Sequence, residues 1–150
     1  MLVHALVAID GSKQSEYALA QFLRMMKPNK AKVTVLYVIA PSRYAVIKEA
    51  PGYSGTQPQP LSEMSERLIK QEEEMVVNRA QMISTDEDVP IEIIIRMGDP
   101  RSEILAAAEE LGVSLIVMGS TGKGLGERLL LGSVSTYVTT HSRFSTLVIR

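Results

Sequence analysis

The residues best suited to hold a charged ligand lie in the glycine-rich segment 119–133. It contains the spacing Gly-x2-Gly-x9-Gly-Ser, formed by Gly119, Gly122, Gly132 and Ser133. Glycines let backbone N–H groups approach an anion with no side chain in the way, and successive N–H groups in a turn form an anion-binding concavity. A helix that starts at Ser133 would add its dipole to this preference. The pattern is typical of a polyphosphate site, although a surface loop whose glycines only make turns has the same composition.

Asp10 is the second residue whose position suggests chemistry, because it directly follows the apolar run 2–9. A carboxylate at such a strand end can accept hydrogen bonds from both hydroxyls of a ribose. The sequence Asp-Gly-Ser also favours a capping role, in which Asp10 stabilises the turn between Ser12 and Ser15. Both interpretations stay open, and the ribose interpretation gains weight if a phosphate loop lies opposite.

Five short apolar runs alternate with four segments of helical spacing, and these elements must position the candidate residues. The expected strands are 2–9, 33–40, 91–97, 114–118 and 145–149. The expected helices are 15–26, 61–84, 100–111 and 133–141. This alternation predicts an α/β fold with a parallel sheet covered by helices on both faces. Ligands then bind at the carboxyl ends of the strands, where Asp10, Val38 and Gly119 fall.

The residues at the helix ends predict where the helices start, and an apolar stripe predicts which face of one helix is buried. Ser15 is a plausible N-cap of the first helix, and Asp99 with Pro100 fits the start of the third. The segment 41–60 holds four prolines and little periodicity, which predicts a long irregular loop. The helix after it carries one apolar stripe that we expect to pack in the core: Leu61, Met64, Leu68, Met75 and Met82.

Composition narrows the function classes. The length of 150 residues predicts one domain, 1–150. With 16 basic and 17 acidic residues and no Trp, the chain is a poor candidate for binding nucleic acid or an anionic membrane. It has no cysteine, no apolar run long enough to span a membrane and no basic leader before its first strand. These features predict a cytoplasmic protein without disulfides.

Several motifs together resemble the universal stress protein family, in its ATP-binding subclass, over nearly the whole chain. They are Val7-Ala8-Ile9-Asp10-Gly11-Ser12, Met97-Gly98-Asp99-Pro100, Leu115-Ile116-Val117-Met118-Gly119-Ser120 and Leu129-Leu130-Leu131-Gly132-Ser133-Val134. The resemblance implies a Rossmann-like, three-layer α/β/α sandwich with strand order 3-2-1-4-5. It also implies a homodimer that pairs through the C-terminal strand, although Phe144-Ser145-Thr146 replaces the proline that often precedes that strand.

The resemblance further assigns an ATP site. Asp10 would hold the ribose, the backbone of Val38 would meet adenine, and Gly119 would lie near the ribose and the first phosphate. The phosphates, with Mg²⁺ or Mn²⁺ on their oxygens, would be bound by Gly122, Gly132, Ser133 and Val134. Thr121 stands where family members often carry His or Arg, so a role for that side chain is not carried over.

Three functions are compatible with these features. The first is an ATP-binding regulatory or stress-response protein acting on an unknown protein partner. The second is a slow ATPase or phosphotransferase that needs a partner; it lacks a visible general base, since His4 fits a structural role in a strand and His141 closes a helix. The third is an interaction module with a vestigial loop, which the complete glycine spacing argues against. We expect the first, with no catalytic residue assigned.

Overall fold

A computed structural model of the chain describes residues 2–27, 30–41, 58–121 and 131–150. Within these ranges strands and helices alternate. The strands are β1 (His4–Ile9), β2 (Lys32–Ile39), β3 (Glu92–Met97), β4 (Leu115–Gly119) and β5 (Ser145–Ile149). The helices are α1 (Lys13–Met26), α3 (Pro58–Glu87), α4 (Pro100–Leu111) and α5 (Ser133–His141).

The strands form one sheet in the order β3-β2-β1-β4-β5, and each neighbouring pair is parallel. The expected strand order is therefore confirmed. Because every strand runs in the same direction, all five carboxyl ends lie at one edge of the sheet, which we call the carboxyl edge. β1 is central, whereas β3 and β5 are the outer strands.

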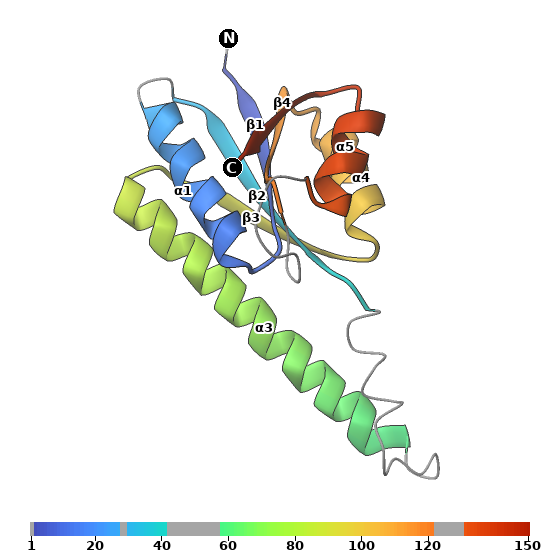
Figure 1. The fold of residues 1–150 in the computed structure, drawn as a ribbon. Helices are drawn as coiled ribbons and strands as arrows, with labels where there is room; N and C mark the ends of the chain where they lie inside the picture. Colours follow the sequence, from blue (N-terminus) through green and yellow to red (C-terminus); the bar gives the residue numbers. More distant parts are fainter. Residues whose placement is uncertain (1, 28–29, 42–57, 122–130) are drawn as a thin grey trace.

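Two helical layers cover the sheet, α1 and α3 on one face and α4 and α5 on the other (Figure 1). Ala5, Val7 and Ile9 of β1 pack toward α1 and α3. Leu6, between them, packs toward α4 and α5. This two-sided burial explains why β1 is a continuous apolar run rather than an alternating one, and it confirms the three-layer α/β/α sandwich.

The first helix starts earlier than its sequence suggests. Ser12, not Ser15, is the N-cap of α1, and its Oγ accepts a hydrogen bond from the backbone N–H of Ser15 at 3.1 Å. Serine is a favoured N-cap at either position. The prediction was wrong because Ser15 is itself buried inside the first turn, where its Oγ donates to the carbonyl of Ser12 at 2.9 Å.

α3 is also longer than predicted at both ends. It begins at Pro58, inside the segment assigned to an irregular loop, and ends at Glu87. Prolines are tolerated in a first helical turn because the N–H groups there have no intrahelical partner. Figure 1 shows that the N-terminal half of α3 extends past the sheet and past α1.

The described side chains of the predicted stripe on α3 do not pack in the core, which corrects the prediction; the Leu61 side chain lies outside the described residues. Met64, Leu68, Met75 and Met82 are 42–62% exposed. The face that packs on the sheet and on α1 is instead formed by Ile69, Val76, Ala80 and Ile83. α3 carries two apolar stripes of helical period, and the stripe with the smaller side chains allows the closer approach to the rest of the fold.

Two ion pairs join α3 to α1. Arg79 binds Glu16 at 2.8 Å, and Arg24 binds Glu87 at 2.7 Å. The hydrogen bonds that the Arg79 guanidinium donates to Glu16 raise the pKa of that guanidinium. Both arginines are about half exposed, so solvent screens each pair and it contributes little stability. Their main effect is to fix the two helices side by side.

Candidate functional site

The register of the sheet places the candidate residues at similar heights along neighbouring strands, near the carboxyl edge. Ile9 of β1 pairs with Tyr37 of β2, so Asp10 and Val38 are the next residues along two adjacent strands. Gly119 ends β4, the strand on the other side of β1. Adjacent parallel strands lie about 4.8 Å apart. Asp10 therefore lies beside Val38 on one side and near Gly119 on the other, while β1 separates Val38 from Gly119.

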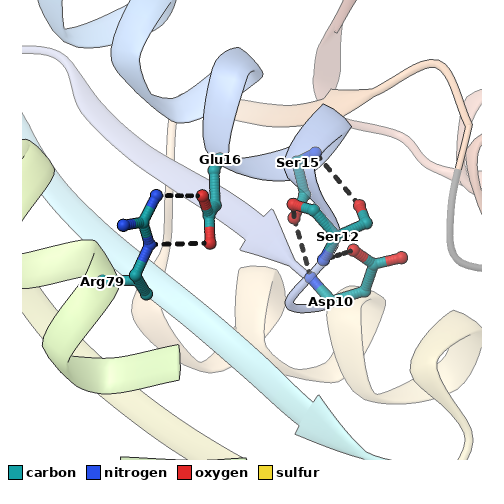
Figure 2. Close-up of polar contacts among 5 residues, drawn as sticks. All are labelled: Asp10, Ser12, Ser15, Glu16 and Arg79. Carbon is teal, nitrogen blue, oxygen red and sulfur yellow. Dashed lines mark hydrogen bonds and ion pairs between the residues drawn. The ribbon is translucent and has the colours of Figure 1, made fainter. Parts of the chain in front are cut away.

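Asp10 organises the turn between β1 and α1. One carboxylate oxygen, Oδ1, accepts a hydrogen bond from the backbone N–H of Ser12 at 2.9 Å, and the backbone N–H of Asp10 donates to Ser15 Oγ at 3.3 Å (Figure 2). Gly11 sits between them at φ +82°, a left-handed conformation that glycine adopts without strain. The capping role left open by the sequence is thus present in the structure.

The two ends of the glycine-rich segment are held together. The backbone N–H of Gly132 donates to the carbonyl of Ser120 at 2.7 Å, and the buried hydroxyl of Ser135 donates to the same carbonyl at 3.0 Å. Ser120 follows β4 directly, so the start of α5 is fixed beside the end of that strand. Gly122, a predicted phosphate ligand, lies outside the described residues.

The N-terminus of α5 differs from those of α1 and α4. Side chains cap the other two helices, Ser12 for α1 and Asp99 for α4. At α5 the N-cap is Gly132, with no side-chain hydrogen bond to the first turn. Ser133 is exposed and Val134 half-buried. The first N–H groups of a helix have no intrahelical acceptor, so this end of α5 is suited to an anion.

Gln14 is a neighbour of the site that the sequence did not indicate. Its Nε2 donates to the carbonyl of Ile149 in β5 at 3.1 Å. A Cβ atom built on Gly119 would clash with Gln14 Oε1, so a larger residue at 119 would require the Gln14 side chain to move. Within the described part of the chain, that buried Oε1 has no hydrogen-bond partner. No local pattern could have found Gln14, because its contacts come from β4 and β5.

The start of α4 confirms the predicted cap. Asp99 Oδ1 accepts from the backbone N–H of Arg101 at 2.9 Å, and Pro100 takes the first helical position. The Arg101 side chain binds Asp99 at 3.0 Å and lies over the Tyr137 ring of α5. Its hydrogen bonds lower the pKa of the Asp99 carboxyl. This pairing keeps a guanidinium between the two helices on the α4–α5 face.

Both histidines lie away from the carboxyl edge. His4 begins β1, and its Nε2 is 2.9 Å from Thr34 Oγ1; burial lowers the pKa of its imidazole, and the charge of Lys32 adds to the effect. His141 ends α5, stacked on Tyr137 with ring centroids 4.0 Å apart. Among the described residues, no three His, Asp or Glu side chains gather where they could hold a metal ion. No helix among them is long and apolar enough to cross a membrane.

The arrangement combines an uncapped helix start, the joined ends of the glycine-rich segment and a strand-end carboxylate at one sheet edge. The model of the universal stress protein family matches residues 1–150. Universal stress protein YxiE of Bacillus subtilis is 34% identical over 147 residues, which are 97% of each chain. The chain belongs to the universal stress protein family. The family that the sequence motifs of this universal stress protein predicted is therefore confirmed.

Solved structures share the fold of this universal stress protein. Hypothetical protein MJ0577 is 28% identical, with a TM-score of 0.76 over 99% of this chain and 96% of that one. A universal stress protein in complex with cAMP is 19% identical (TM-score 0.65; 99% and 96% covered). The universal stress protein from Archaeoglobus fulgidus in complex with dAMP is 18% identical (TM-score 0.63; 100% and 98% covered). The last two, being distant in sequence, show the fold alone.

Proposed function

We propose that this universal stress protein binds ATP at the carboxyl edge and acts as a nucleotide-dependent regulatory or stress-response protein. The observation that carries the proposal is the hydrogen bond from Gly132 to the Ser120 carbonyl. It holds the uncapped start of α5 beside the strand end that bears Gly119, at the level of Asp10 and Val38. The nucleotide complexes of cAMP and dAMP in proteins of the same fold support a nucleotide as the ligand class.

We assign each part of ATP to a group on the chain. The N–H groups of Ser133 and Val134 would donate to phosphate oxygens, with Gly122 contributing from the loop. The backbone of Val38 would meet adenine, and Asp10 would accept from the ribose. Mg²⁺ or Mn²⁺ neutralises phosphate charge when bound. Since no acidic cluster is found among the described residues, the cation would be held through the phosphates rather than by a protein cage, as is common for Mg²⁺.

Calorimetry with ATP and Mg²⁺ tests the proposal directly. We expect saturable binding near the micromolar range, about −8 kcal/mol, and weaker binding of GTP because the strand-end backbone near Val38 would read the adenine edge. Denaturing freshly purified protein and identifying the released nucleotide shows what it carries and whether ADP accumulates. An absence of heat and of saturation at millimolar ATP would rule out the proposed ligand.

Asp10→Ala should separate the capping role from the ribose role. If Asp10 accepts from the ribose, the variant should weaken ATP binding by about 1.5–3 kcal/mol and should weaken 2′,3′-dideoxy-ATP far less. Asp10→Asn is the matched control, because its amide oxygen can still accept from the Ser12 N–H and keep the turn. Calorimetry with both ligands gives the answer: equal losses for the two nucleotides would leave Asp10 with the capping role alone.

A homodimer through β5 is also part of the proposal. β5 is an outer strand, and its described residues are half-buried or exposed. An outer strand presents unpaired N–H and C=O groups that are usually covered, charged or paired, and β5 contains neither proline nor charge. Antiparallel pairing with β5 of a second copy across a two-fold axis would satisfy these groups and close the assembly.

A further inference from the structure

α3 carries an exposed apolar surface that the proposed nucleotide site does not use. We call it the α3 seam. Its members are exposed by 53%, 42%, 62% and 55%, for Met64, Leu68, Met75 and Met82 in that order. They make up four of the ten large exposed apolar residues in the described chain. The core face of α3 is formed by other residues, Val76 and Ala80 among them. The seam can therefore contact a partner without disturbing the intramolecular packing.

The seam has the spacing of a coiled-coil interface. Leu68, Met75 and Met82 follow one another at intervals of seven, and Met64 stands four residues before Leu68. These are three successive a positions and one d position of a heptad repeat. The seam is about 27 Å long at the helical rise per residue. Its N-terminal part lies on the half of α3 that extends past α1 and the sheet (Figure 1), where a second helix could approach.

The charged residues beside the seam indicate which helix could pair with it and in which orientation. Arg67 and Glu74 occupy g positions, and Glu72 and Arg79 occupy e positions. In a parallel, in-register pair, each g residue faces the e residue five places further along the other helix. Arg67 then faces Glu72 of the second copy, and Glu74 faces its Arg79. An antiparallel pair centred on the seam would instead bring Glu72 against Glu72 and Glu74 against Glu74.

The intramolecular ion pair of Arg79 leaves room for a second partner. Arg79 already binds Glu16 of α1, yet its side chain remains 52% exposed, so the guanidinium can donate to a second carboxylate. The other d positions hold Gln71 and Asn78. Polar residues in a seam lower the stability of the pair while fixing its register, which predicts a reversible association that forms at high protein concentration.

We propose that α3 is a self-association surface, on which the α3 helices of two copies pair in parallel and in register along the α3 seam. The complementary charges identify the occupant as a second copy of this chain. This interface is separate from β5, which lies at the far side of the sheet from β3, and it does not depend on nucleotide binding. Where both interfaces form, the chain would build assemblies larger than a dimer.

Cysteine trapping tests the pairing, because the chain has no cysteine of its own. In a parallel in-register pair, identical a residues face each other within disulfide range, roughly 4.4–6.8 Å between Cα atoms. Met75→Cys under mild oxidation should therefore give a covalent dimer. Lys70→Cys is the matched control, since Lys70 is exposed on another face of α3. We expect at least about tenfold faster cross-linking for Met75→Cys, because pairing raises the effective thiol concentration toward millimolar.

Both variants are compared in a Val148→Pro background, so that the β5 interface makes no contribution. Equal cross-linking of Met75→Cys and Lys70→Cys would overturn the proposal. It would mean that a second copy of this chain does not cover the seam and that a different protein is the candidate partner. A mixture of Gln71→Cys and Met75→Cys chains provides the orientation test. If the mixed disulfide forms faster than the Met75→Cys homodimer, the helices pair antiparallel and the proposed parallel register is wrong. Neither outcome bears on ATP binding, which calorimetry of the same variants reports separately.

Discussion

Gly132→Val is expected to abolish ATP binding at accessible concentrations while leaving the fold intact. Gly132 has φ −66° and ψ 165°, a conformation open to any residue, so valine causes no backbone strain there. Its branched side chain would, however, stand at the start of α5, where we place the phosphates. We expect a loss of affinity of about 100-fold or more, equivalent to roughly 3 kcal/mol.

Calorimetry with ATP measures this loss, and far-UV circular dichroism with a melting curve checks the fold. Thr140→Val is the matched control, because it places the same side chain on the exposed surface at the opposite end of α5. Gly122→Val should behave like Gly132→Val, although its surroundings are outside the described residues. Normal ATP affinity in either glycine variant would mean that this loop does not cradle the phosphates.

Val148→Pro should convert the proposed β5 dimer into single chains. The carbonyl of Ile149 accepts from the Ser120 N–H on the β4 side. Successive residues of a strand direct their N–H and C=O groups to opposite sides, so those of Val148 point away from β4 toward the open edge. Proline at 148 removes an outward N–H and spares the ladder that holds β5 in its own sheet.

Light scattering at micromolar concentration should give twice the chain mass of 16.5 kDa for the wild type and one chain mass for the variant. Leu147→Pro provides the contrast. It removes an N–H that faces β4, so it should lower the melting temperature strongly. Val148→Pro loses side-chain packing and the dimer contact but keeps the ladder to β4, so it should lower the melting temperature less. A wild type with the mass of one chain, with and without ATP, would exclude the dimer.

The fold could be predicted largely from local patterns, because each apolar run and each cap acts over a few residues. The strand order came from the family resemblance, since apolar runs alone do not say which strands are neighbours. The placement of Asp10 and Gly119 at one edge followed from parallel topology. Ser15 was mistaken for the N-cap because serine suits both positions, and only the packed turn decides between Ser12 and Ser15.

Other features depend on contacts between distant segments. Periodicity shows that α3 has an apolar stripe, but Met75 and Val76 belong to different stripes, and only the approach of α1 and the sheet determines which is buried. Gln14 carries no signal at all, because its partner Ile149 is 135 residues further along the chain. Residues that connect elements in this way become visible only once the elements are assembled.

The last carbonyl of β5 has a practical consequence for handling the protein. Ile149 accepts hydrogen bonds from Ser120 and Gln14, which brings the chain end to the root of the glycine-rich loop. An affinity tag or fluorescent fusion appended after Arg150 would therefore emerge at the carboxyl edge, close to the proposed nucleotide site. β1 begins at the opposite edge of the sheet, so the same tag placed on the N-terminal side of β1 would leave the proposed site accessible for titration or soaking.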